Sequence, residues 1–123
     1  MEIFINKRFN GPPNSGNGGY VAGLIAKEIG KCCEVKLVAP PPLEKKLLLK
    51  KSNENYELYD GKTLVCIANT TTIDNDPCDF VSFSDALIGS KNGLSKFEPI
   101  HAMPDCFVCG PNRKEGDGLR LFT

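Results

Sequence analysis

The stretch "FNGPPNSGNGGYVAGLIA", residues 9–26, joins a loop of glycines and prolines directly to a small, apolar segment with helical character. Prolines and glycines in residues 11–16 interrupt both kinds of regular structure. Asn17 is a good helix N-cap, because its side-chain oxygen can accept a hydrogen bond from an unpaired amide of the first turn. Gly30 is a natural left-handed stop. We therefore expect a helix that begins near Asn17 or Gly18, ends at Gly30 and is buried on most sides. The apolar residues that recur at helical spacing are Val21, Leu24, Ile25 and Ile29.

Strand patterns lie on both sides of this helix. Asp60 and Gly61 separate two of them and form the strongest hairpin signal in the chain. The order of strand, helix and then several strands predicts an α+β domain with one long helix packed on a curled antiparallel sheet. A short helix capped by Ser82 or Ser84 is expected in residues 76–90. The predicted strands are residues 2–9, 34–39, 45–51, 56–59 and 63–72.

Composition limits the classes of function. The chain has 123 residues, which suggests a single domain, and its fifteen basic and fifteen acidic residues cancel. No nucleic-acid partner is therefore expected. The longest apolar runs are too short to span a bilayer, and the start lacks the pattern of a signal peptide, so no membrane association is expected. The six cysteines are best interpreted as reduced thiols of a cytoplasmic protein.

The tail, residues 104–123, has a different character from the rest of the chain. It is rich in glycine, cysteine, arginine and aspartate, and it ends in "GLRLFT". This ending predicts the opening of another strand. We expect the sequence to be the front part of something longer.

The segment "GNGG", residues 16–19, is the first candidate site. A phosphate-binding loop would need a following Lys-Ser/Thr pair, and a dinucleotide fingerprint would need a glycine in place of Val21. Two interpretations stay open. The free amides of the helix N-terminus can face a ligand, or the glycines only make a tight turn into the helix.

Cys106 and Cys109, in "CFVCG", are the second candidate site. The motif is half of a zinc knuckle, and a redox dithiol is disfavoured because no helix is expected to begin at Cys106 and lower its pKa. We favour two packed thiols in a turn, with no metal and no cofactor. The only histidine, His101, is interpreted as a hydrogen-bonding loop residue. The remaining ligands a zinc ion would need can come only from residues that do not repeat the spacing: Cys32, Cys33, Cys78 and His101.

The segment "GNGGYVAGLIAKEIG", followed by an antiparallel run with a proline-rich break, resembles the hotdog-fold acyl-CoA thioesterases. In that fold a curved antiparallel sheet wraps around a long helix. The tail "HAMPDCFVCGPNRKEGDGLRLF" is similar to the central linker of thioesterase-like proteins built from two fused hotdog units, and to the "CxxCG…GL" entry of phenylacetate-type thioesterases. The resemblance covers nearly the whole chain. It implies a hotdog domain in residues 1–103, followed in residues 104–123 by a linker and the start of a second, missing unit.

The resemblance also implies a site. In hotdog thioesterases, glycine amides at the helix N-terminus form part of the pocket for the thioester carbonyl, acting as oxyanion donors. Gly18 and Gly19 match these positions, and Asn17 stands where many relatives carry histidine. We assign Tyr20, Gly23 and Ala26 to substrate binding. The small residues Ala22, Gly23 and Ala26 would leave space beside the helix for an acyl or pantetheine arm.

One departure from the family concerns the catalytic acid. The phenylacetate-type family has an acidic residue where this chain has Ala26, and Glu28 is expected on the wet face of the helix. The catalytic carboxylate is therefore not found in this half, and in fused hotdogs it can come from the other half.

The resemblance implies an acyl-CoA hydrolase, or its acyl-thioester-binding half, that works as a homodimer or pseudo-dimer. The first alternative is a non-catalytic hotdog scaffold or acyl-ligand-binding module. The second is a small zinc-binding domain.

Overall fold

The computed structural model describes residues 1–122, and these divide into two compact units. Unit 1 is Met1–Ile73, and unit 2 begins at Asp74. The hotdog domain of residues 1–103 that the resemblance implies stays a prediction. Within unit 2 the second helix packs with the C-terminal segment, where Gly93 lies directly against Phe122.

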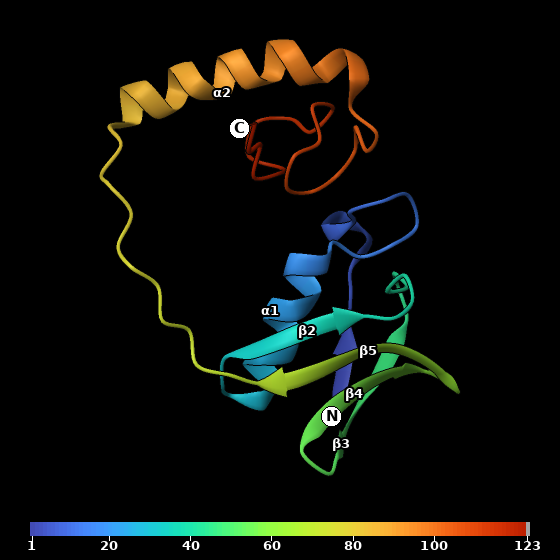
Figure 1. The fold of residues 1–123 in the computed structure, drawn as a ribbon. Coiled ribbons are helices and arrows are strands. Elements are labelled where there is room, and N and C mark those ends of the chain that lie inside the picture. Colours follow the sequence, from blue (N-terminus) through green and yellow to red (C-terminus); the bar gives the residue numbers. More distant parts are fainter. Residues whose placement is uncertain (123) are drawn as a thin grey trace. The chain divides into compact units, whose positions relative to one another are not determined.

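Unit 1 is a five-stranded antiparallel sheet with one α-helix, which confirms the predicted α+β class (Figure 1). The strands lie in the order β1-β3-β4-β5-β2, so the strands before and after the helix form the two edges of the sheet. A bulge between Leu58 and Tyr59 accompanies the bend of the long hairpin, because an extra residue bends the strand that carries it. The elements are β1 (Glu2–Phe4), a 3-10 turn (Lys7–Phe9), α1 (Gly18–Ile29), β2 (Cys33–Leu37), β3 (Lys46–Ser52), β4 (Asn55–Asp60) and β5 (Thr63–Thr70).

The first strand is shorter than predicted. The sequence suggested a strand over residues 2–9, but β1 stops at Phe4 and a 3-10 turn follows. The cause is Asn6, whose side-chain oxygen accepts a hydrogen bond from the Arg8 amide at 2.9 Å. This local bond competes with the ladder of the sheet and turns the chain away from it.

Helix α1 has the predicted caps. The Asn17 side-chain oxygen accepts a hydrogen bond from the Tyr20 amide at 3.1 Å. Gly30 has a φ of 72° and donates its amide to the Ala26 carbonyl at 2.9 Å, which closes the helix as a left-handed cap. The expectation of burial on most sides was wrong. Only one face is buried, because within unit 1 only the sheet covers the helix, and Gly19 and Gly23 are exposed.

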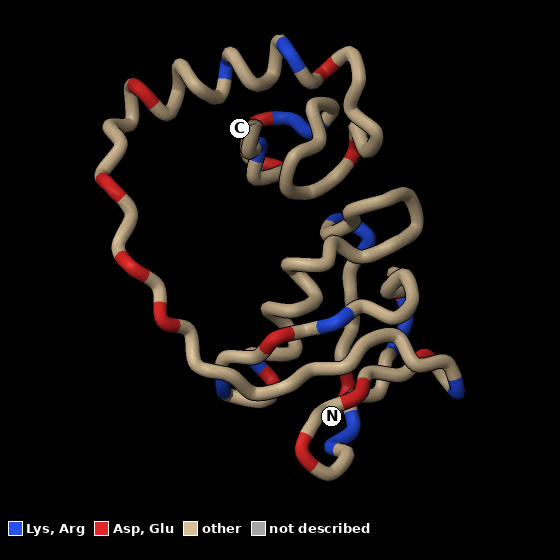
Figure 2. Tube along the Cα trace, viewed as in Figure 1, with Lys and Arg blue, Asp and Glu red and all other residues tan. Residues whose placement is uncertain are grey.

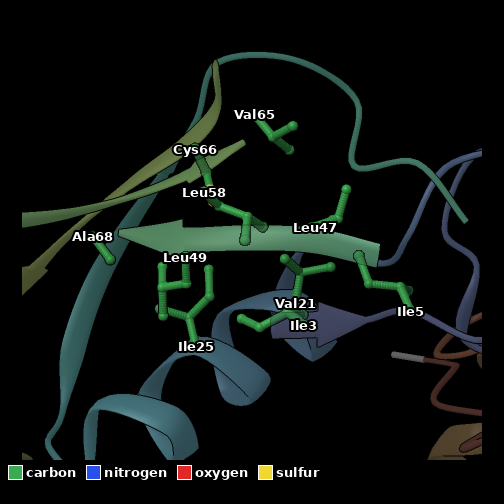
Figure 3. Close-up of a cluster of buried hydrophobic side chains, with 10 residues drawn as sticks. All are labelled: Ile3, Ile5, Val21, Ile25, Leu47, Leu49, Leu58, Val65, Cys66 and Ala68. Carbon is green, nitrogen blue, oxygen red and sulfur yellow. The ribbon is translucent and has the colours of Figure 1, made fainter. Parts of the chain in front are cut away.

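The core of unit 1 lies between α1 and one face of the sheet (Figure 3). Val21 and Ile25 point from the helix towards the sheet and are completely buried. On β3 the pleat alternates, because Leu47 and Leu49 are buried while Leu48 is 43% exposed. The buried cluster consists of Ile3, Ile5, Val21, Ile25, Leu47, Leu49, Leu58, Val65, Cys66 and Ala68.

The predicted Asp60-Gly61 hairpin is confirmed. Asp60 pairs with Thr63 at the end of the β4–β5 ladder, and Gly61 has a φ of 59°, the left-handed conformation such a turn requires. Lys45 forms an ion pair with Asp60 at 3.1 Å.

Unit 2 contains one long helix and a tightly turned C-terminal segment. Residues 71–82 have no regular structure, and nearly all are exposed. Helix α2 (Phe83–Phe97) begins and ends later than predicted, and Ser82 rather than Ser84 caps it, accepting from the Asp85 amide at 3.1 Å. A 3-10 turn (Glu98–Ile100) follows. None of the helices in residues 1–122 combines the length and apolar character needed to cross a membrane.

The predicted strand at "GLRLFT" was wrong for the described residues, in which 119–122 form no strand. The Leu119 and Leu121 amides do donate to the carbonyls of Phe107 and Val108, both at 2.9 Å. The alternating pattern of residues 119–122 therefore corresponds to these two backbone hydrogen bonds, which are too few to form a strand. Thr123 lies outside the described residues.

Replacing Ile25 by alanine should lower the free energy of unfolding of unit 1 by about 2–5 kcal/mol, because it leaves a cavity between α1 and the sheet. Lys27→Ala, on the exposed side of the same helix, should change it by less than about 0.5 kcal/mol. Denaturation followed by tyrosine fluorescence measures this unit alone, because all three tyrosines lie in it and the chain has no tryptophan. Equal effects of the two substitutions would contradict the packing described here.

Candidate functional site

The glycine-rich loop before α1 is an ordered structure held by backbone hydrogen bonds. The Gly11 amide donates to the Ser15 carbonyl at 2.9 Å and closes the loop on itself. The Gly16 amide donates to Pro41 at 2.7 Å, and the Asn17 amide donates to Phe9 at 2.8 Å. These bonds tie both ends of the loop to neighbouring segments, so the N-terminus of α1 has a fixed position.

The glycines of "GNGG" differ in their surroundings. A Cβ on Gly16 would lie 3.0 Å from Val21 and 3.1 Å from Ile5, and a Cβ on Gly18 would lie 3.2 Å from Leu37. These two glycines allow close packing. Gly19 is exposed, and a Cβ there would make only an ordinary contact of 3.4 Å with the Asn17 side chain. Packing therefore accounts for Gly16 and Gly18, but it does not account for Gly19.

The first two amides of α1 have no acceptor in the described chain. Asn17 accepts from the Tyr20 amide through its side chain and from the Val21 amide through its carbonyl, at 3.1 and 3.0 Å. Within residues 1–122, the Gly18 and Gly19 amides donate to no protein atom. Every helix begins with such amides, and they carry the positive end of the helix dipole. No side chain covers the Gly19 amide.

A hollow of about 290 Å³ lies beside this helix end. Its walls are the loop, Gly18, the end of β2 and the segment after β2. Leu37 at the end of β2 and Val38 after it are 44% and 53% exposed. The segment continues into three prolines, and the Gly16–Pro41 hydrogen bond fixes it against the loop. The hollow is thus mainly apolar and has rigid walls.

The structure brings only part of the predicted site to this hollow. Gly18 lines it, and Gly19 is exposed at the same helix end. The side-chain oxygen of Asn17 serves as the helix cap. The Tyr20 ring stacks on Phe9, with ring centroids 3.9 Å apart and planes 11° from parallel, so it braces the loop.

Gly23 and Ala26 do not line the hollow, but they continue the face on which Gly19 lies. Positions 19, 23 and 26 fall on one side of a helix. Gly23 is exposed, and a Cβ added there would meet nothing within 4 Å, while Ala26 is half-buried. This side of α1 is therefore a shallow strip of small residues.

The sequence did not predict that Leu37 and Val38 form one wall of the hollow beside the N-terminus of α1. The alternating pattern of residues 34–39 predicted a strand, but not that its last residues would face the helix end. A relevant signal was present, because the strand ends in apolar residues directly before Pro40. The exposure of Leu37 and Val38 is a feature of the site that only the structure reveals.

The site has no charged or acid–base group among the described residues. The first turns of α1 carry no charge in Figure 2, and its only charged residues are Lys27 and Glu28 near the far end, both exposed. None of the residues that line the hollow is acidic, basic or histidine. The arrangement can receive a carbonyl or an anion through amide donors, but it holds no group that could transfer a proton.

The cysteine motif in unit 2 has the expected form of two packed thiols in a turn. Cys106 is 2% exposed and Cys109 is half-buried. Burial raises the pKa of the Cys109 thiol, and the side-chain hydrogen bond with Cys106 raises this pKa further. The Nδ1 atom of His101 accepts a hydrogen bond from the Met103 amide at 3.1 Å, which confirms its expected role in the loop.

Comparisons with protein families, with curated proteins and with solved structures find no match to this chain.

We expect the purified protein to contain no stoichiometric zinc. In the part of the chain that the structure describes, no three His, Cys, Asp or Glu side chains lie close enough to share a metal ion. Two thiols alone do not complete the four-coordinate shell of structural zinc. Elemental analysis of chelator-washed protein measures this directly. One equivalent of zinc per chain, with unfolding of unit 2 on its removal, would contradict the prediction.

Proposed function

We propose that unit 1 is a hotdog unit that binds an acyl thioester, of the acyl-CoA type, at the N-terminus of α1. The sheet order supports the hotdog assignment. Because β1 and β2 form opposite edges, the chain must cross the whole width of the sheet between them, and α1 makes that crossing. Its buried side faces core residues of β1, β3, β4 and β5. A sheet around one helix is the arrangement that the resemblance implies.

The observation that carries the proposal is the uncovered amide of Gly19 beside that of Gly18. Two adjacent donors at the positive end of a helix suit a carbonyl oxygen that gains negative charge. The apolar hollow beside Gly18 suits the carbon atoms next to that carbonyl. The strip of Gly19, Gly23 and Ala26 offers an acyl or pantetheine arm a path along the helix, while Tyr20 and Asn17 hold the donors in place.

Hydrolysis requires a group that this site lacks. Attack of water on a thioester needs a base or a carboxylate nucleophile, and none lines the hollow. The isolated chain would therefore bind a thioester but hydrolyse it very slowly. In a pseudo-dimer with a second, non-identical hotdog unit, that other unit would supply the carboxylate.

The uncovered amides of Gly18 and Gly19 also favour the second candidate function, a non-catalytic hotdog that binds acyl ligands or acts as a pairing scaffold. The two candidates share the binding step and differ only in turnover. Turnover measured on the assembled protein distinguishes them.

Pairing with a second unit is part of the proposal. A single sheet of this order has two open edges, and open edges favour association. The β2 edge is the longer. It ends in Leu37, which Val38 follows, and the exposed side chains of both residues adjoin the hollow. A second copy at this edge would bury these side chains and cover the site. We therefore place the interface of a homodimer, or of a pseudo-dimer, at β2.

We expect at least one acyl-CoA thioester to bind the chain in a calorimetric titration with a panel of acyl lengths. Gly19→Val should weaken binding by at least about tenfold, because a branched side chain shields the amide donors. The fold should tolerate this change, since the position is exposed and its Cβ has room. The matched control is Lys27→Val, which adds the same side chain at the far end of α1 and should bind as well as the wild type.

The same experiment can refute the site. If no thioester binds, or if Gly19→Val binds as tightly as Lys27→Val does, the loop is only a turn into the helix. Thioester hydrolysis, followed by release of the free thiol, should remain close to the uncatalysed rate in all three proteins.

Sedimentation velocity should show a dimer of this chain at micromolar concentration. Leu37→Lys should shift the protein towards monomer, because it places a charge in the proposed interface. Leu48→Lys is the matched control, since Leu48 is equally exposed, at 43% against 44%, but lies on the inner strand β3. A monomeric wild type, or loss of the dimer in both variants, would argue against an interface at the β2 edge.

A further inference from the structure

The turn that carries Cys106 and Cys109 has the geometry of a single helical turn. The Gly110 amide donates to the Cys106 carbonyl at 2.8 Å, the i to i+4 bond of an α-helix. In that conformation side chains three residues apart are neighbours, about 5–6 Å apart at their Cβ atoms. A disulfide needs Cα atoms roughly 4.4–6.8 Å apart and Cβ atoms roughly 3.5–4.5 Å apart. The backbone of this turn therefore brings the two thiols close together, and a small tightening of the turn would let the two sulfur atoms bond.

The two thiols touch, and they differ in access. Their side chains form a hydrogen bond with each other. Cys106 is 2% exposed, whereas Cys109 is half-buried and lines a hollow of about 240 Å³ together with His101 and Leu121. A small reagent can reach Cys109 through this hollow, whereas Cys106 does not line the hollow and is almost completely buried.

Polar contacts hold the turn from both sides. The Asn112 amide donates to the Pro104 carbonyl at 3.0 Å, and its side chain donates to the Asp105 carboxylate at 3.0 Å. The Arg113 guanidinium donates to the Asp105 carbonyl at 2.9 Å and pairs with Asp117 at 3.1 Å. Gly110 completes this frame, because a Cβ there would lie 2.5 Å from backbone atoms of Cys106. The thiols are thus held together without a helix N-terminus.

We propose that Cys106 and Cys109 form a redox-active dithiol that closes into an intramolecular disulfide by exchange with a small-molecule disulfide. The Cys109 thiolate attacks one sulfur of the small disulfide, whose S–S bond breaks and releases one thiol. Cys106, after losing its proton to solvent, then attacks the Cys109 sulfur. The mixed disulfide breaks and releases the second thiol. In sum, two protein thiols and one small disulfide become one protein disulfide and two small thiols.

The rate of this exchange should be slow at neutral pH. Burial and the contact with Cys106 raise the pKa of Cys109, so little thiolate is present below that pKa. The rate should increase as pH rises towards the raised pKa, and replacing Cys106 by serine should make Cys109 react faster at pH 8. The position of the equilibrium, rather than the speed of attack, is what the preformed turn favours.

The disulfide would act on the C-terminal segment. Phe107 and Val108, the two residues between the cysteines, accept the amides of Leu119 and Leu121. The same segment reaches Phe122, whose backbone lies against Gly93 of α2. Fixing the turn with a covalent bond should strengthen these two hydrogen bonds, so the Leu119 and Leu121 amides should exchange with solvent more slowly in the oxidised protein.

The test uses the full chain and glutathione at defined ratios of reduced to oxidised form, followed by acid quench, alkylation and tryptic mass spectrometry. Trypsin releases residues 97–113 as one peptide, which holds Cys106 and Cys109 and no other cysteine. We expect this peptide to be lighter by two hydrogen atoms and to carry no glutathione. At the same ratio in urea, the oxidised fraction should correspond to an equilibrium constant smaller by on the order of tenfold, because the turn is then unformed.

Two single variants test the order of attack. Cys106→Ser should retain glutathione on Cys109, because the second thiol is missing. Cys109→Ser should leave Cys106 unmodified, because that thiol is buried. The exposed Cys78 is the internal control and should take up glutathione in every protein.

Three results would overturn the proposal. The first is a wild-type peptide that stays reduced while Cys78 is modified, and the second is retention of glutathione on wild-type Cys109. The third is an equilibrium constant no larger in the folded protein than in urea. The wild-type measurements need no substitution, so they remain decisive even if a variant fails to fold.

Discussion

Unit 1 depends on the close approach of Gly16 to the core. A Cβ at this position would lie 3.0 Å from Val21 of α1 and 3.1 Å from Ile5, the first residue after Phe4 of β1, so these two side chains would have to shift. The amide of the same residue also holds Pro41, and with it the segment after β2. Gly16 therefore packs tightly against the core and also holds the wall beside the helix end. Val21, which it contacts, is completely buried.

The same packing leaves α1 unequal on its two sides. Its buried side is aliphatic and fully covered, while the other side is small and uncharged as far as Lys27. A solvent-facing side of a helix usually carries polar or charged residues, since nothing there favours glycine over better helix formers. Gly19 and Gly23 are thus costly for the stability of an isolated unit. Gly19 and Gly23 would allow a ligand, or a second unit paired at the open β2 edge, to approach the helix closely.

The sequence predicted those features of the fold that depend on local chemistry. Asn17 and Gly30 capped α1 as expected, and Asp60 with Gly61 located the hairpin, because each of these residues acts through its own backbone or its near neighbours. Two other features were not predicted. The side-chain bond of Asn6 ended β1 early, and "GLRLF" paired with only two carbonyls instead of forming a strand. The site shows the same division. The sequence placed Gly18 and Gly19 in the first turn of the helix, but the wall at Leu37 and Val38 depends on how the end of β2 packs beside that turn, which the apolar residues before Pro40 do not specify.

The exposed segment of residues 72–81 contains the boundary between the two units. It has no regular structure, and it carries Asp74, Asp76 and Asp79 with no lysine or arginine among them (Figure 2). Like charges along an extended chain repel one another, so the segment should lengthen at low ionic strength and contract when salt screens it. Ionic strength thus becomes a control on the length of this segment.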